Sequence, residues 1–261
     1  MTAAAAAPGP GPATSLEPGL AKVPEVTLAF WIVKILATTL GETGGDAVTM
    51  SMGLGYLVGT GIFALLFAVA VAAQLRARSY QPALYWFTII ATTTVGTTLA
   101  DYVDRSLGIG YAGGSSLLLA LLLASLAAWR LWLGSVAVSS VATPAAEGCY
   151  WVTILCSQTL GTALGDWTAD TEGVGYSGGA LIFGGLLLLV VLAWRFTRCS
   201  RTVLFWLAFV LTRPLGAVLG DLLDKPLAQG GLALSRYSAS AALLAAMLLL
   251  LWFFPGRANR A

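Results

Sequence analysis

The chain has 261 residues, of which 58% are hydrophobic and 10% are charged, and its mean hydropathy is +0.84. Soluble domains average roughly 45–50% apolar and about 25% charged residues, so this composition excludes an ordinary water-soluble globule. The net charge of +2 comes without a long basic block, which argues against a nucleic-acid partner. Histidine is absent and the three cysteines lack C-x-x-C spacing, which disfavours a zinc or copper site.

Residues 1–24 form a tract rich in Ala, Pro and Gly, for which we expect a disordered tail. From Val26 onward, long apolar segments alternate with short polar joints. Most of these segments have roughly the 17–25 residues that cross a hydrocarbon core about 30 Å thick. They are residues 26–45, 57–75, 83–101, 114–133, 149–166, 178–196, 202–221 and 238–254. The sequence therefore predicts an all-α membrane protein with eight transmembrane helices.

Arginines collect where the even-numbered segments end, whereas the opposite joints are acidic and carry only Arg105, Lys225 and Arg236 as cations. By the positive-inside rule, both termini are expected in the cytoplasm. Trp129, Trp194 and Trp252, which close even-numbered segments, would form one belt at the same membrane interface with the tryptophans that open the odd-numbered segments. The latter are Trp31, Trp86, Trp151 and Trp206.

Each of these tryptophans precedes an aspartate by fifteen residues, which reveals a unit used four times. The aspartates are Asp46, Asp101, Asp166 and Asp221. The longer middle interval contains a predicted loop at residues 134–148. We expect repeats at 25–80, 81–134, 135–200 (with the loop) and 201–256, and a tail at 257–261. Because each unit contains two spans, the four two-helix repeats would be parallel, related by an axis along the membrane normal.

Small residues lie four apart just before each aspartate, which allows helices to approach closely in lipid. The pairs are Gly41 and Gly45, Gly96 and Ala100, Gly161 and Gly165, and Gly216 and Gly220. We therefore expect the odd helices at the centre. The even helices, rich in Leu, Val and Ala nearly all round, would be peripheral and face lipid.

Polar residues of the odd helices stack in layers below the aspartates. Ionisable groups at membrane depth usually pair with one another or line an ion path. We predict a cation-binding and metal-binding site made by Asp46, Asp101, Asp166 and Asp221 together with Glu42. The polar path and its counter-charges would comprise Lys34, Thr38, Thr39, Thr93, Thr97, Gln158, Thr162 and Arg213. Oxygen ligands suit Mn²⁺, Mg²⁺, Ca²⁺, Na⁺ or H⁺.

A structural interpretation of the same charges stays open. Each aspartate could close its helix near the headgroups, or pair with Arg213, Lys34 or a loop arginine. For Lys34 and Arg213 themselves a structural ion pair is the favoured role, because buried cations need partners whatever the protein does.

An enzyme is not expected. Gly175–Gly179 fits the G-x-S-x-G pattern, but the chain has no histidine to activate Ser177 and no strand precedes it. No phosphate-binding loop or zinc-protease motif occurs, and we expect no cofactor.

The string from Lys34 to Asp46, with the pattern K-x3-T-T-x-G-E-T-x-G-D, resembles the signature of a bacterial repeat family of uncharacterised, so-called membrane-anchored multi-pass proteins. The resemblance extends over about residues 28–254 in four copies, and the later copies lose the Lys and Glu. It implies a protein of the bacterial inner membrane, without an activity to carry over.

From the polar layers we expect a cation transporter or channel, with efflux of a divalent metal such as Mn²⁺ as one form. The alternative is a non-transporting scaffold or sensor whose intramembrane charges are structural ion pairs. The expected partners are the lipid bilayer and a hard cation, and a homo-oligomer is compatible with the sequence.

Overall fold

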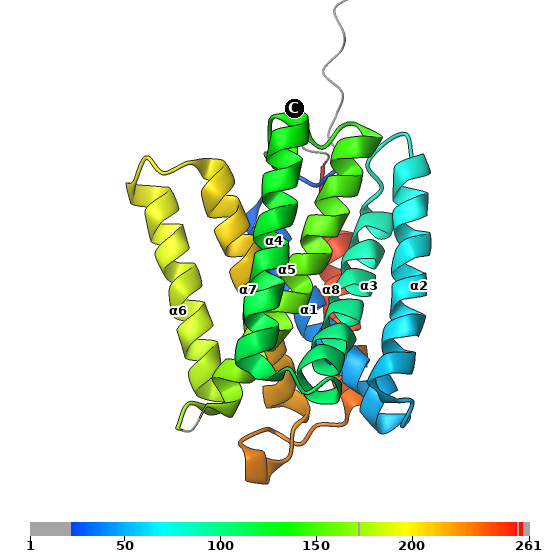
Figure 1. Ribbon diagram of the computed structural model, residues 1–261, viewed down its shortest axis with the longest axis vertical. Helices are drawn as coiled ribbons and strands as arrows, with labels where there is room; N and C mark the ends of the chain where they lie inside the picture. Colours follow the sequence, from blue (N-terminus) through cyan, green and yellow to red (C-terminus); the bar gives the residue numbers. More distant parts are fainter. Residues whose placement is uncertain (1–21, 172, 255, 258–261) are drawn as a thin grey trace, which may run out of the picture.

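A computed structural model describes residues 22–171, 173–254 and 256–257 (Figure 1). Most of the predicted N-terminal tail, residues 1–21, lies outside the described residues, as do residues 258–261 of the C-terminal tail. All eight predicted segments are α-helical. The helices are α1 (Leu28–Asp46), α2 (Gly55–Arg76), α3 (Pro82–Asp101), α4 (Gly110–Leu133), α5 (Pro144–Asp170), α6 (Gly175–Phe196), α7 (Arg201–Asp224) and α8 (Arg236–Phe253).

Six of these helices are long and apolar enough to cross a membrane, namely α2, α3, α4, α6, α7 and α8. These lengths and compositions are those of a multi-pass membrane protein. Helices α1 and α5 are less apolar, because they carry buried polar residues such as Lys34, Glu42, Glu147 and Gln158. These side chains face protein, which removes the cost of exposing them to lipid.

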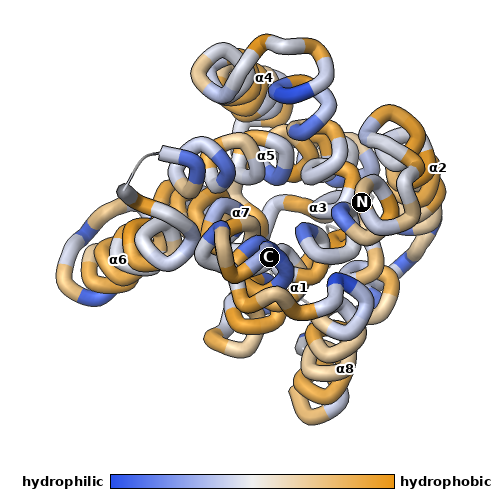
Figure 2. The backbone as a smooth tube through the Cα atoms, turned by 90° about the horizontal axis from the view of Figure 1, so that it is seen from below, coloured by the Kyte–Doolittle hydropathy of each residue, from blue (hydrophilic) through white to orange (hydrophobic). Residues whose placement is uncertain are grey.

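The odd-numbered helices form a closed ring. Helix α1 packs against α3 and α7, and α5 packs against the same two helices. Viewed from below, α1, α3, α5 and α7 surround the centre while α2, α4, α6 and α8 lie outside them (Figure 2). The outer helices expose many large apolar side chains, including Leu57, Leu65, Leu121, Leu189 and Leu248.

Each outer helix packs mainly on the central helix of the following repeat. Helix α2 lies on α3, α4 on α5 and α6 on α7, and α8 returns to α1 and closes the circle. The two helices within one repeat contact each other far less. The four units therefore interlock, and none of them is a hairpin that packs chiefly on itself.

The small residues of the repeat are the places where consecutive central helices touch. At each first glycine of a pair, an added Cβ would lie 3.0 Å or less from an atom of the next central helix. Each glycine is paired with the residue of the next central helix that packs against it: Gly41 with Thr93, Gly96 with Gln158, Gly161 with Arg213, and Gly216 with Thr38. Helix packing in lipid depends on such close approach, and here it sets the register of the whole ring.

The predicted tryptophan belt is wrong for Trp129 and for three of the four tryptophans that open the odd-numbered segments, whereas Trp194 and Trp252 are exposed. Trp86, Trp151 and Trp206 are buried, and among these four only Trp31 is partly exposed. They pack with Tyr85 and other aromatic residues at one end of the ring. The tryptophans stand at one depth on four central helices, so packing around the shared axis takes them away from the lipid interface.

Helix α5 begins at Pro144 instead of near residue 149, so the predicted loop at 134–148 is shorter. The Thr143 hydroxyl accepts a hydrogen bond from the Ala146 N–H at 3.2 Å, and Pro144 takes the first helical turn, where no N–H is needed. At the opposite end of the ring, π-helical turns at Ala47–Ser51 and Tyr102–Ser106 extend α1 and α3 beyond their aspartates.

Candidate cation site in the central helix ring

The four repeat aspartates gather at one end of the central ring, and each is at most 4% exposed. They form two bridged pairs. Asp101 and Asp166 share Arg105, whose Nε lies 3.0 Å from Asp101 Oδ1 and whose Nη2 lies 3.0 Å from Asp166 Oδ2. A guanidinium fork suits two carboxylates at once, so this pair is held by a permanently charged bridge.

The second pair, Asp46 and Asp221, shares Lys225. The Lys225 Nζ lies 2.6 Å from Asp46 Oδ2 and 3.0 Å from Asp221 Oδ1. Arg236, at the start of α8, binds Asp224 at 2.7 Å, and its Nε lies 3.7 Å from Asp46 Oδ2. Asp46 therefore faces two cations, Lys225 from the connection after α7 and Arg236 from the first turn of α8.

Lys225 lies just beyond the end of α7, in a strongly acidic environment. Burial acts to lower its pKa, but the carboxylates of Asp221, Asp46 and Asp224 outweigh burial and raise the pKa above its ordinary value. Lys225 therefore carries its proton at any physiological pH.

Both bridging cations occupy the same place in their repeats, four residues after the aspartate. Pairing of an aspartate with a loop arginine was one of the two structural alternatives, and Arg105 makes such a pair. The role of Lys225 was not expected. The spacing of these cations from the aspartates was the available signal, because residues four apart lie on one helix face. In the other two repeats this position is Met50 or Asp170, so Arg105 and Lys225 each form ion pairs with two of the four aspartates.

One turn inward, Arg213 joins all four central helices. It belongs to α7, and its Nη2 lies 2.9 Å from Glu42 Oε2 of α1 and 2.5 Å from the hydroxyls of Thr97 in α3 and Thr162 in α5. Thr97 also donates to Glu42 Oε2 at 3.3 Å. Arg213 and Glu42 are fully or almost fully buried, as a charged pair at membrane depth requires.

Thr38 and Thr39 have local roles. The Thr38 hydroxyl bonds to the carbonyls of Ile35 and Thr212, and the Thr39 hydroxyl bonds to that of Ile35. These two threonines satisfy helix backbone groups and contribute to the α1–α7 contact.

The inner end of the polar path is different, because its groups lack hydrogen-bond partners among the described residues. They are Lys34 Nζ, Thr93 Oγ1 and both amide atoms of Gln158, all on fully buried residues. Lys34 Nζ lies 3.8 Å from the centroid of the Phe209 ring. The expected ion pair is therefore found for Arg213 and not for Lys34.

The closest grouping of possible metal ligands in the described residues is asymmetric. Glu42, Asp46 and Asp221 each offer an oxygen, and these oxygens lie within 4.8 Å of one another. Repeat 1 alone has a carboxylate in the layer of Glu42, where the others have Thr97, Thr162 and Ala217. The structure thus brings three of the five predicted ligands together beside Lys225 and places Asp101 and Asp166 at a separate bridge.

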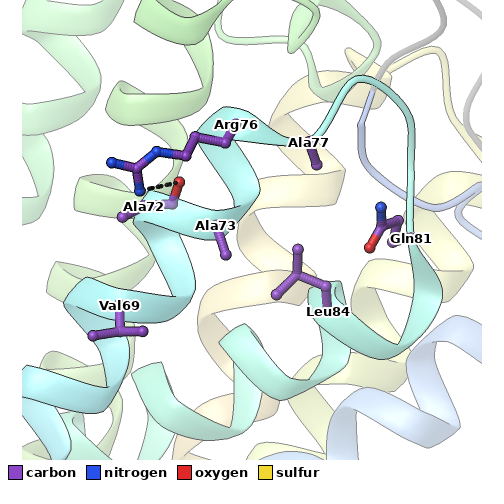
Figure 3. A pocket seen from close by; sticks show the side chains of 7 residues that line it. All are labelled: Val69, Ala72, Ala73, Arg76, Ala77, Gln81 and Leu84. Carbon is purple, nitrogen blue, oxygen red and sulfur yellow. Dashed lines mark hydrogen bonds between the residues drawn. The ribbon is translucent and has the colours of Figure 1, made fainter.

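A surface groove lies well away from these carboxylates. It is formed between the end of α2 and the start of α3, and Arg76 there donates to the Ala72 carbonyl at 3.4 Å (Figure 3). Its other lining residues are Val69, Ala73, Ala77, Gln81 and Leu84. It holds no acidic side chain, so the ring interior remains the candidate site.

The family described as Repeat of Unknown Function (DUF347) matches the chain four times, at residues 29–80, 84–132, 149–200 and 204–258. The chain belongs to this repeat family. Each copy contains one central helix with its aspartate and one outer helix, as the fourfold spacing of Trp and Asp predicted. Comparisons with curated proteins and with solved structures find no match.

Proposed function

We propose that this protein is a membrane transporter or channel for a hard cation, with divalent-metal efflux of the Mn²⁺ type as its most specific form. The observation that carries the proposal is the gathering of buried carboxylates from all four repeats at one end of the central ring. Carboxylates at membrane depth are costly, and they commonly mark ion pathways. Oxygen donors without histidine favour hard cations.

In this proposal the eight helices cross the bacterial inner membrane as four parallel two-helix repeats. The outer helices face lipid with their exposed leucines, and the cation moves along the polar layers between the inner four. Arginines lie at the end of the ring that carries the aromatic cluster. By the positive-inside rule, we expect that end and both chain termini in the cytoplasm. The carboxylates would then face the opposite side.

The ion pairs support a second function of another class. Arg105, Lys225 and Arg213 neutralise the acidic groups internally, as would be expected of a scaffold or sensor that uses charges only to lock helices together. In that case the carboxylates matter for folding and for a partner, and cation flux is absent.

Flux measurements on the purified protein in liposomes separate the two functions. We expect Mn²⁺ entry, followed with an internal fluorescent indicator, to depend on the protein. Asp46→Asn and Asp221→Asn should each lower it by about tenfold or more, the factor equivalent to about 1.4 kcal/mol of lost interaction.

Asp170→Asn is the matched control, since Asp170 is an exposed acid on the same side that contacts Tyr111. Its flux should equal that of the wild type. Normal folding with no Mn²⁺, Mg²⁺, Ca²⁺, Na⁺ or H⁺ flux in the wild-type protein would exclude transport and leave the scaffold.

A further inference from the structure

We propose that Lys225 is an internal cation that occupies the metal site of Glu42, Asp46 and Asp221, and that a divalent cation binds by displacing its ammonium group. This inference rests on the proposed function and deepens it. It assigns the site to one side of the ring, between α1 and α7, instead of to all four aspartates equally.

The geometry places a positive charge where a metal ion would sit. The Lys225 Nζ contacts Asp46 at 2.6 Å and Asp221 at 3.0 Å, and the oxygens of both lie within 4.8 Å of a Glu42 oxygen. Lysine carries a compact, strongly hydrated point charge, which is the closest side-chain counterpart of a hard cation.

The site has coordinating capacity that Lys225 leaves unused. Asp46 is 1% exposed, and its Oδ1 is buried and accepts no hydrogen bond from the described residues. An unpaired carboxylate oxygen in the protein interior is costly, so it calls for a cation or a proton donor. A metal ion that accepts several oxygens would satisfy it, whereas one ammonium group does not.

The connection after α7 allows the ammonium to leave without unfolding. The Lys225 N–H donates to the Asp221 carbonyl and the Lys225 carbonyl accepts from the Ala233 N–H, both at 2.9 Å. Its side chain is 12% exposed, so it lies at the margin of the protein. Rotation of the side chain alone, on a fixed backbone, would move the charge outward.

The charge count favours a divalent ion. Four carboxylates and three side-chain cations surround the site: Glu42, Asp46, Asp221 and Asp224, with Arg213, Lys225 and Arg236. With all of them ionised, the cluster carries one formal negative charge. Exchange of the monovalent ammonium for a divalent cation neutralises it, and exchange for a monovalent cation leaves it unchanged.

The other aspartate pair supplies an internal comparison. Arg105 bridges Asp101 and Asp166 as Lys225 bridges Asp46 and Asp221, but Thr97 and Thr162 stand where a third carboxylate would be needed. Arginine also holds two carboxylates with a rigid fork. We therefore expect the Arg105 bridge to be permanent and the Lys225 bridge to be exchangeable.

The first experiment uses the full-length wild-type protein in detergent. It has three lysines, and reductive methylation followed by peptide mass spectrometry reports the reactivity of each. Added Mn²⁺ should raise the methylation rate of Lys225 about tenfold, because an ammonium held between two carboxylates is protected until it is displaced. Lys22, which is paired with Glu147 at 2.9 Å, serves as the control and should not change.

The second experiment compares Lys225→Met with Arg76→Met by Mn²⁺ titration, observed through loss of the free-ion electron paramagnetic resonance signal. Arg76 lies in the surface groove between α2 and α3, away from the carboxylates. Removing the competing charge should tighten Mn²⁺ binding about tenfold in Lys225→Met, whereas Arg76→Met, which removes an equal charge outside the site, should leave it near the wild-type value. Adding Asp46→Asn to Lys225→Met should abolish the gain. Size-exclusion profiles check that each variant is folded.

Equal gains in the two Met variants, or a Lys225 reactivity that Mn²⁺ does not change, would overturn the inference. The methylation result decides the matter if Lys225→Met fails to fold. Liposome flux tests the proposed function separately. Displacement of Lys225 without flux would exclude transport and support the metal site. Flux without displacement would support transport and exclude the exchange of Lys225 for the metal ion.

Discussion

At the scale of single residues, the charges of the ring interior fall into two kinds. Arg213, Arg105 and Lys225 are paired with carboxylates, whereas Lys34 has no acceptor among the described residues. A buried pair loses stability when one partner is removed, because the remaining charge is left uncompensated. An unpaired buried charge costs stability while it is present. The two kinds therefore predict opposite effects of substitution.

Arg213→Met should be strongly destabilising. It leaves Glu42 buried without its cation, a loss of about 3–5 kcal/mol in comparable buried pairs. It also removes the contact that joins Thr97 and Thr162 to Glu42. We expect a lower midpoint of thermal unfolding in detergent, and partial recovery when Glu42→Gln is added. A double variant no better than Arg213→Met would show that the pair is not the cause.

Lys34→Met should have the opposite sign. The side chain is fully buried against the Phe209 ring, so a neutral side chain of similar length removes an unsatisfied charge and keeps the packing. We expect the thermal midpoint to stay equal to that of the wild type or to rise. A clear fall would contradict this and mean that the Lys34 ammonium is stabilised where it lies, for example by the Phe209 ring.

At the level of the helices, the close packing of the ring depends on glycines against which side chains of the next central helix lie. A Cβ on Gly41 would lie 2.9 Å from Thr93 Cβ, whereas a Cβ on Gly44 would meet nothing within 4 Å. Both residues belong to α1 and neither needs a positive φ. The two positions differ in the space available, which makes them a matched pair.

Gly41→Ala should therefore destabilise the α1–α3 contact by about 1–3 kcal/mol, the usual cost of overpacking. Gly44→Ala should be neutral or stabilising by up to about 1 kcal/mol, because Ala is the better helix former. Thermal unfolding of the two variants in one detergent measures the difference. Similar midpoints would mean that the ring tolerates separation of α1 from α3.

For the whole molecule, the positive-inside rule predicts which end of the helix bundle faces the cytoplasm. Cys199 is exposed in the connection from α6 to α7, beside Arg198 and Arg201, so we expect it in the cytoplasm. In a background with Cys149→Ser and Cys156→Ser, a membrane-impermeant thiol reagent should label Cys199 only after the cells are permeabilised.

A second position gives the opposite expectation. Leu227 is 74% exposed in the connection from α7 to α8, at the other end of the helices. Leu227→Cys, in a chain that also carries Cys199→Ser, should be labelled in intact cells. Labelling of both positions from the same side would contradict the proposed crossing of the membrane by α7.

The helices, the fourfold repeat and the residues of the polar layers could all be predicted from the amino-acid sequence. Apolar length predicts spanning helices, and a fixed interval from Trp31 to Asp46 in four copies predicts four units, because both properties are local along the chain. The small residues beside each aspartate also predicted a close central packing, which the contacts of Gly41, Gly96, Gly161 and Gly216 explain.

The pairing of the charges could not be predicted, because it depends on how the helices pack. The sequence predicted one site of four aspartates and Glu42, but Arg105 and Lys225 divide the aspartates into two pairs and Glu42 joins only one of them. The partner of a buried charge comes from another helix or from the next connection, so sequence distance does not reveal it. The burial of Trp86, Trp151 and Trp206 has the same origin, because closure of the ring turns residues of an expected interface toward a shared axis.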